Sequence, residues 1–256
     1  MKVICVFNQK GGVGKTTTNI NLCTYLALSG YRVLSIDIDP QGNSTSGFGI
    51  EKSKLEKSMY DVLVDDTSLD DVIIKMEDIK NLYVAPSTVD LAGAEIEMID
   101  VKNRELVLLD KLLDMQQKFD YVFIDCPPSL GLITINALTA ANSVIIPIQC
   151  EFYALEGVQQ LMNTYNLVRR SLNSDLKIEG VILTMFDNRT KLCNEVAAEV
   201  IKTFKKKVYK SVVTRNVRLA EAPSYGMPIA LYDNESKGAN CYKNICKEFI
   251  KRQKGE

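Results

Sequence analysis

The chain has 256 residues, of which 46% are hydrophobic, and its 31 Lys and Arg balance its 32 Asp and Glu. This length suffices for one large domain, so we expect residues 1–256 to form a single domain. The balanced charge excludes a polyelectrolyte built for nucleic acid or an anionic membrane, and any such partner would have to meet a local patch. The chain has no histidine, so hydrolytic chemistry would rest on carboxylates, lysines and a bound cation.

The seven cysteines include no C-x-x-C pair, and most lie in apolar runs. This pattern predicts buried, reduced thiols rather than disulfides, a zinc site or an iron–sulfur site. The first residues lead directly into a strand-like run without the features of a signal peptide, and no uninterrupted apolar segment reaches membrane-spanning length. We therefore expect a cytoplasmic protein and no membrane partner.

Short apolar runs alternate with helical patterns along the whole chain. The expected strands are residues 3–7, 32–37, 82–85, 121–125, 143–148, 178–184 and 208–213. The expected helices are residues 15–29, 104–118, 133–141, 154–171, 194–205 and 237–251, while residues 51–80 are expected to form short helices. The alternation predicts an α/β fold with a single doubly wound, mostly parallel sheet, helices on both faces, and ligands at the carboxyl ends of the strands.

The first expected strand runs into a glycine-rich loop that a helix follows. Such a loop turns backbone N–H groups toward phosphate, and the helix N-terminus adds its dipole. Lys15 would neutralise the β and γ phosphates and the Thr16 hydroxyl would ligate Mg²⁺. The predicted nucleotide-binding residues are Gly11, Gly12, Val13, Gly14, Lys15, Thr16 and Thr17. A glycine-rich turn with a chance lysine is the alternative, and the flanking strand and helix disfavour it.

A second lysine, Lys10, lies at the entry of the same loop. It is five residues before Lys15, so it is poorly placed to contact the same phosphates. A second cation can be supplied to a phosphate cluster from a neighbouring subunit, as arginine fingers are. Lys10 would then couple nucleotide binding to dimerisation. The alternative, left open by the spacing alone, is a solvated loop residue.

Two further expected strands end in acids. Asp37 and Asp39 end the second strand, and Asp39 is the better placed of the two to orient a water for attack on the γ phosphate or to hold a water of the Mg²⁺ shell. Pro40 and Gly42 indicate a turn that follows it. Asp125 ends the apolar run 121–125 in the form of a Walker B strand, whose acid contacts Mg²⁺ through water.

Five segments together resemble the ParA/Soj family of chromosome and plasmid partitioning ATPases. They are K-G-G-V-G-K-T-T-T-N-I-N-L, D-I-D-P-Q-G-N-S-T-S-G, F-I-D-C-P-P-S-L, P-I-Q-C-E-F-Y-A-L-E-G-V and R-N-V-R-L-A-E-A-P-S-Y-G, and they span nearly the whole chain. The resemblance implies a P-loop ATPase with a deviant Walker A loop, in which Lys10 contacts the nucleotide of the other monomer in an ATP sandwich homodimer. It also implies Lys15, Thr16 and Thr17 on the phosphates and Mg²⁺, Asp39 as the catalytic acid and Asp125 as the Walker B residue.

By the same resemblance, the ATP-bound dimer binds nonspecific DNA on the nucleoid, and a ParB-type protein stimulates hydrolysis and releases it. The basic residues that match the family's DNA contacts are Arg189, Arg218, Lys237, Lys243 and Lys247, and the run 205–207 is a further candidate. Each of these could equally be a solvated surface charge. The chain starts at the first strand, as in the small chromosomal type that lacks a helix-turn-helix domain. Thr214 departs from the family, which commonly has proline there.

Two related classes compete with this interpretation. The MinD type forms the same sandwich dimer but binds lipid through a C-terminal amphipathic helix, and residues 242, 245, 246, 249 and 250 have helical apolar spacing. Such a stripe more often packs on the core. Reductases related to the nitrogenase iron protein would need a pair of cluster-ligating cysteines, and nothing suggests a partner for Cys126.

Overall fold

A seven-stranded sheet forms the centre of the computed structural model, which describes residues 1–151 and 154–255. Phe152 and Tyr153, within one of the five family segments, lie outside the described residues. The strand order is β3-β4-β2-β5-β1-β6-β7, and every pair is parallel except β3 with β4. The strands are β1 (Lys2–Val6), β2 (Val33–Asp37), β3 (Ile74–Lys75), β4 (Leu82–Ala85), β5 (Tyr121–Asp125), β6 (Ser143–Gln149) and β7 (Lys177–Thr184).

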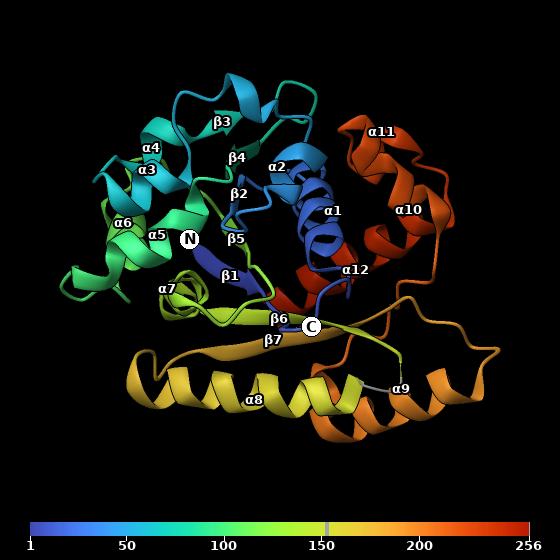
Figure 1. Ribbon diagram of the computed structural model, residues 1–256. Helices are drawn as coiled ribbons and strands as arrows, with labels where there is room; N and C mark the ends of the chain where they lie inside the picture. Colours follow the sequence, from blue (N-terminus) through green and yellow to red (C-terminus); the bar gives the residue numbers. More distant parts are fainter. Residues whose placement is uncertain (152–153, 256) are drawn as a thin grey trace.

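Helices cover both faces of this sheet (Figure 1). The α-helices are α1 (Lys15–Leu28), α2 (Asn43–Gly47), α3 (Met59–Val64), α4 (Leu69–Val72), α5 (Leu91–Glu97), α6 (Val107–Asp114), α7 (Leu132–Ala140), α8 (Ala154–Ser171), α9 (Lys191–Phe204), α10 (Val217–Glu221), α11 (Ile229–Tyr232) and α12 (Lys237–Lys254). Short 3₁₀ turns are η1 (Lys52–Lys54), η2 (Met98–Asp100), η3 (Lys205–Lys207) and η4 (Ala222–Tyr225). The predicted doubly wound α/β fold is confirmed.

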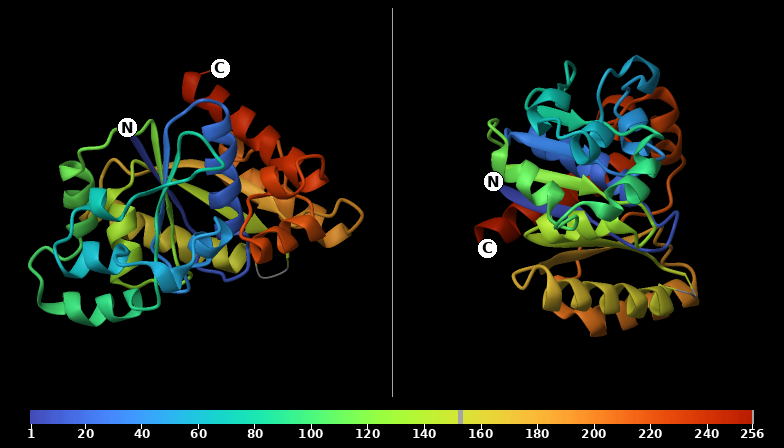
Figure 2. Two further views of the ribbon diagram at one scale, coloured as in Figure 1. Left: turned by 90° about the horizontal axis from the view of Figure 1, so that it is seen from above. Right: turned by 60° about the vertical axis from the view of Figure 1, so that its left-hand side comes forward.

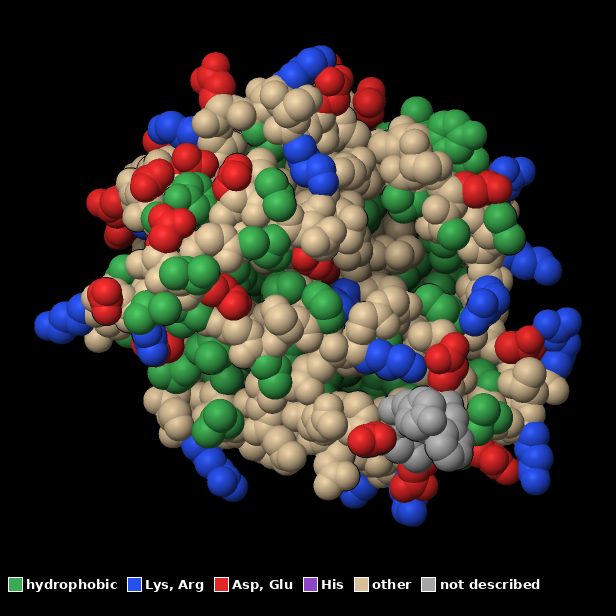
Figure 3. All heavy atoms as spheres, in the orientation of Figure 1, with side chains coloured by type: hydrophobic (Ala, Val, Ile, Leu, Met, Phe, Trp, Pro, Cys, Tyr) green, Lys and Arg blue, Asp and Glu red, His purple; other side chains and the backbone are tan. Residues whose placement is uncertain are grey.

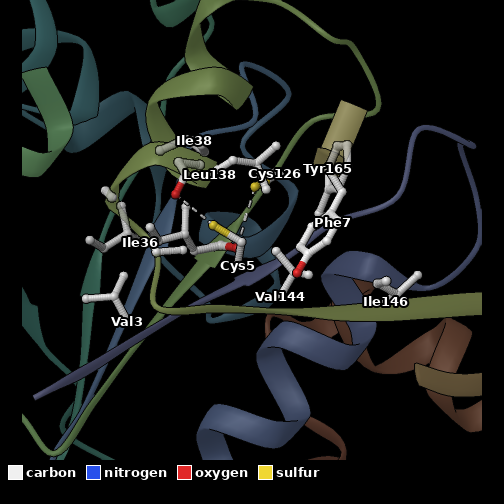
Figure 4. Close-up of a cluster of buried hydrophobic side chains, with 14 of the residues drawn as sticks. Val3, Cys5, Phe7, Ile36, Ile38, Cys126, Leu138, Val144, Ile146 and Tyr165 are labelled. Atoms are coloured by element: carbon white, nitrogen blue, oxygen red, sulfur yellow. Dashed lines mark hydrogen bonds between the residues drawn. The ribbon is translucent and has the colours of Figure 1, made fainter. Parts of the chain in front are cut away.

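Two cores form because successive side chains of a strand point to opposite faces of the sheet. On β1, Val3 and Cys5 pack with the helices of one face, and Ile4 and Val6 pack with α1 and α12 on the other. Figure 4 shows Cys5 in the first core, close to Cys126 at the end of β5. Six of the seven cysteines are buried and all seven are free thiols, as the apolar runs around them predicted.

The predicted strand at residues 208–213 is wrong. The backbone there meets β7 only at isolated bridges, where Tyr209 N–H donates to the Val181 carbonyl at 2.8 Å and Val213 N–H to the Leu183 carbonyl at 2.9 Å. Between them, the N–H groups of Lys210 and Ser211 donate to the carboxylate of Glu248 on α12, at 2.9 and 3.0 Å. A side chain from 37 residues away therefore replaces the neighbouring strand as the hydrogen-bond partner.

The predicted helix at residues 104–118 is shorter in the structure, where α6 runs from Val107 to Asp114. Beyond it, the N–H groups of Gln116 and Gln117 donate to the carboxylate of Asp70, at 2.7 and 3.1 Å, instead of to carbonyls one helical turn back. Residues 51–80 form the expected short helices, and they also include the antiparallel strand β3, which the sequence pattern missed.

Candidate active site

The glycine-rich loop and the two acidic strand ends meet at one edge of the sheet because β5 lies between β1 and β2. Asp125 is in register with Val6 on one side and with Asp37 on the other. Carboxyl ends of adjacent parallel strands lie side by side, so three chain segments converge where a doubly wound fold binds its ligand. Seen from above, this edge lies opposite the one at which both termini lie (Figure 2, left).

The glycine-rich loop is held in a fixed shape by its neighbours. Gly12 and Gly14 have φ values of 73° and 88°, a region that side-chain-bearing residues rarely adopt. The hydroxyl of Thr184, at the end of β7, donates to the Val13 carbonyl at 2.8 Å. At the loop's entry, Lys10 N–H donates to Asn8 Oδ1 at 3.0 Å, and the Asn8 amide donates to the Pro147 carbonyl at 2.7 Å. The loop is therefore preorganised by β6 and β7.

The two lysines of the loop lie in different surroundings. Lys15 is buried, and its Nζ donates to the Lys10 carbonyl at 3.3 Å, inside the curve of the loop. Burial lowers the pKa of Lys15, while the nearby Asp125 carboxylate acts in the opposite direction. The Lys10 side chain is part-exposed, and its Nζ lies 3.3 Å from Glu151 Oε2, just beyond β6. The Lys15 ammonium thus lies inside the loop, whereas the Lys10 ammonium lies beside Glu151.

Asp125 and Asp37 are both fully buried. Oδ2 of Asp125 accepts from the Ser44 hydroxyl at 2.8 Å, but its Oδ1 has no hydrogen-bond partner within the described part of the chain. Asp37 Oδ2 accepts from the backbone N–H and the hydroxyl of Thr45, both at 2.8 Å. Burial raises the pKa of Asp37 to about 6, and burial together with the charge of Asp37 raises the pKa of Asp125 to about 7.

Asp39 follows Asp37 at the start of the expected turn. Its backbone N–H donates to Asp37 Oδ1 at 3.1 Å, its carbonyl accepts from Gly42 N–H at 2.8 Å, and its Oδ1 accepts from Gln41 N–H at 3.0 Å. Asp37 therefore holds the turn in place, and this contact is consistent with a structural role for Asp37. The turn leads into α2, which the sequence pattern missed.

A cavity of about 220 Å³ lies beside the glycine-rich loop. It is lined by Gly14, Thr17, Thr184, Met185, Val213, Thr214, Arg215, Asn216, Leu219, Ala220 and Tyr242. The face seen in Figure 1 is hollowed, and hydrophobic side chains line part of the hollow (Figure 3). Sequence reasoning singled out Gly14, Thr17 and Thr214 but did not predict the cavity, because the rest of its wall comes from three other segments that lie far apart in the chain. The segment R-N-V-R supplies part of the wall, so it was the sequence feature that could have indicated this cavity.

Comparison with known proteins identifies the family of this chain. The family described as AAA domain matches residues 1–178. The sporulation initiation inhibitor protein Soj of Bacillus subtilis is 59% identical over 247 residues, which cover 96% of this chain and 97% of the relative. The chromosome partitioning protein ParA of Myxococcus xanthus is 50% identical, covering 98% of this chain and 88% of the relative. The chain belongs to the ParA/Soj family of partitioning ATPases.

The solved structures agree with this family and with the fold. The cobyrinic acid a,c-diamide synthase of Mycobacterium smegmatis, with bound ADP and magnesium, superposes with a TM-score of 0.86. It is 35% identical, and the match covers 100% of this chain and 97% of that one. The predicted P-loop ATPase fold is thereby confirmed for this ParA/Soj member.

The basic residues predicted from the ParA/Soj resemblance lie in three places. Arg189, after β7, is held by Asp187 through Nε and Nη2, at 2.9 and 2.7 Å. Arg218, in α10, pairs with Glu221 at 3.0 Å and Asp233 at 3.4 Å. Lys237, Lys243 and Lys247 are exposed on α12. Among these five, Lys247 alone lines a groove with Lys206 and Lys207 of the run 205–207.

Proposed function

We propose that this protein is a DNA-partitioning ATPase in which Mg²⁺-ATP drives a sandwich homodimer. The dimer binds DNA without sequence preference, and hydrolysis, slow alone and stimulated by a ParB-type partner, releases it. The single observation that carries this proposal is that the two loop lysines lie in different surroundings. Lys15 is buried inside the loop, whereas Lys10 faces out of it beside Glu151, where a second subunit could approach.

The residues at the strand ends fit a Mg²⁺ ion. A buried carboxylate oxygen without a hydrogen bond destabilises the fold unless a cation or a water molecule binds it. Asp125 Oδ1 is such an oxygen among the described residues. Thr16, Asp39 and Asp125 would hold Mg²⁺ directly or through water, and the ion would neutralise charge on the β and γ phosphates. The same pocket of negative charge explains why a neighbouring lysine, Lys15, is needed.

Each remaining residue of the loop has a proposed part. The N–H groups of Gly11, Gly12, Val13 and Gly14 would bind phosphate oxygens, and Thr17 would contact a phosphate. Asp39 would orient the attacking water. The cavity beside Gly14 and Thr17 would take the adenine base, since it is apolar and opens next to the phosphate loop. Its wall includes Thr214.

The family supports the proposed partners and location. The relatives named for chromosome partitioning support a ParB-type partner and a DNA substrate. We propose that the protein acts in the cytoplasm, on the nucleoid, and that residues 1–256 act as one ATPase domain. Both cores pack on a single sheet, which supports one domain.

A MinD-type membrane cycle is the second candidate, and α12 argues against it. Its apolar residues Tyr242, Ile245, Cys246 and Phe249 are buried in the core, so they do not form a free stripe for a bilayer. No helix within residues 1–151 and 154–255 is long and apolar enough to cross a membrane.

The deciding experiment is co-sedimentation with random-sequence DNA and, separately, with anionic liposomes, each without nucleotide, with ADP and with ATP. An Asp39→Ala variant would hold the ATP state. We expect strong DNA binding only with ATP, and we expect it to be lost at high salt. Pelleting with liposomes and not with DNA would replace this proposal with the membrane cycle.

A further inference from the structure

A groove lined by basic side chains runs between α12 and the segment that follows α9. Lys206, Lys207 and Lys210 lie on one side, and Lys247, Lys251 and Arg252 lie on the other. The groove has a volume of about 710 Å³ and includes two acids, Glu179 and Glu248, in a chain whose net charge is −1. Six basic side chains therefore face two acids in this groove, although the chain as a whole is nearly neutral.

Both acids of the groove are already bonded within the protein. Glu248 accepts the N–H groups of Lys210 and Ser211 and lies 2.7 Å from Arg252 Nη2. Glu179 accepts from Lys2 at 2.6 Å and from Ser143 at 2.7 Å. Burial alone would raise the pKa of each acid, but these hydrogen bonds hold both pKa values below their usual range. The carboxylates of Glu179 and Glu248 therefore stabilise the fold, and they neutralise the charges of Lys2 and Arg252.

The five lysines of the groove form no ion pair with any acid in the described ranges. Like charges on two facing walls repel, and the positive potential between them attracts an anion. This distinguishes the groove from Arg189 and Arg218, whose charges are compensated by Asp187 and by Glu221 with Asp233.

The length of the basic stripe points to an extended anion. Lys243, Lys247, Lys251 and Lys254 recur at spacings of four, four and three residues, so they share one face of α12. At about 1.5 Å per residue, this stripe is about 16 Å long. Each strand of duplex DNA carries one phosphate per about 3.4 Å of its axis, so the stripe runs past several phosphates.

We propose that this groove binds the phosphodiester backbone of DNA and is complete within one subunit. The inference rests on the proposed function, in which DNA is the partner. Glu179 is near the amino end of β7, five residues before Thr184, which contacts the phosphate loop. At about 3.3 Å per residue, the groove lies roughly 16 Å from that contact. ATP would then act by joining two finished grooves in one dimer, not by forming the site.

The test compares two triple variants with the same loss of charge. Lys206→Gln/Lys210→Gln/Lys247→Gln removes lysines of the groove. Its control, Lys80→Gln/Lys102→Gln/Lys118→Gln, removes exposed lysines outside it. DNA affinity is measured by fluorescence anisotropy on a random-sequence duplex, with ATP in the Asp39→Ala background, across a series of salt concentrations. ATP-dependent dimerisation is measured in parallel by sedimentation.

We expect the groove variant to lose affinity for DNA by about 100-fold or more at low salt. Its log–log salt slope should shrink by about 2.7 per engaged subunit, since each lost phosphate contact removes about 0.9. Dimerisation should be unchanged, and the control variant should bind as the parent does. Without nucleotide, the parent should bind weakly and with about half the salt slope.

The contrary results separate the two proposals. If the parent binds DNA and the groove variant binds with the same affinity and slope, the groove inference is overturned while the proposed function stands. If the parent binds no DNA in any nucleotide state, the proposed function fails and this inference fails with it. Groove-dependent binding to vesicles of phosphatidylcholine and phosphatidylglycerol, without DNA binding, would assign the groove to lipid headgroups and also overturn it.

Discussion

Lys10 and Glu151 form an ion pair within one subunit, with 3.3 Å between Lys10 Nζ and Glu151 Oε2. Glu151 also lies 3.9 Å from Arg215 Nη2 and accepts from the Gln149 amide. If Lys10 serves the nucleotide of a second subunit, it must leave this carboxylate first. In the proposed dimer, this pair would oppose dimerisation until ATP supplied a stronger anion.

Glu151→Gln should promote the ATP-dependent dimer. The side chains of the pair are 32% and 48% exposed, so its loss is worth at most about 1 kcal/mol per subunit, or up to about 30-fold in the dimerisation constant of a symmetric dimer. Sedimentation velocity across an ATP titration would measure the shift of the midpoint to lower ATP. Glu156→Gln, which removes an exposed acid of α8, is the control. An unchanged midpoint in Glu151→Gln would show that the ion pair has no restraining effect.

Lys10→Ala should bind ATP but fail to form a stable dimer, because it removes the ammonium that we propose reaches across the interface. Equilibrium binding of a fluorescent ATP analogue and size-exclusion chromatography with ATP would separate the two properties. Lys118→Ala is the matched loss of one exposed lysine. A Lys10→Ala protein that dimerised and bound DNA as the parent does would refute the trans role.

Thr184→Val should destabilise the protein and weaken nucleotide binding, because it leaves the Val13 carbonyl of the phosphate loop without its 2.8 Å hydrogen bond. An unsatisfied buried acceptor costs about 1–3 kcal/mol. Urea unfolding and ADP titration would measure the two effects. Thr139→Val is a sharp control, since the buried Thr139 hydroxyl has no partner among the described residues and its removal should be neutral or stabilising. Equal losses in both variants would contradict the assigned role of Thr184.

Gly49→Ala should destabilise the protein by at least about 2 kcal/mol, because Gly49 has a φ of 81° and an added Cβ would lie 2.8 Å from the Gly226 carbonyl. This contact joins the segment after α2 to η4. Chemical denaturation would measure the loss. Gly157→Ala in α8, where a Cβ meets nothing within 4 Å, should instead stabilise by up to about 1 kcal/mol. A harmless Gly49→Ala would mean that the two segments separate readily.

The sequence predicted the parts of the molecule that depend on local pattern. The runs at β1, β2 and β5 are apolar on consecutive residues because helices cover both faces, and the glycines of the phosphate loop adopt positive φ values that glycine favours. Residues 208–213 are just as β-branched, but the carboxylate of Glu248 takes two of their N–H groups. No local pattern contains that information.

For the candidate site, too, the sequence indicated the residues with a local pattern and missed the contacts between distant segments. Lys15, Asp39 and Asp125 could be proposed from the sequence because Lys15 starts a helix, Asp125 ends a strand and Asp39 closely follows the end of another. The cavity beside Gly14 was missed because its wall joins β7, α10 and α12. The pairing of Lys10 with Glu151 was also invisible, since 141 residues separate them.

The positions of the chain's ends determine what an attached fluorophore would sense. Lys2 Nζ donates to Gln253 Oε1 at 2.6 Å, so a dye at either end would sit beside the basic groove and far from the nucleotide. An engineered cysteine would allow a dye to be attached elsewhere on the molecule. Because six of the seven native cysteines are buried, a cysteine at exposed Glu156 would react with a maleimide first, and the dye would then mark the start of α8 instead of a chain end.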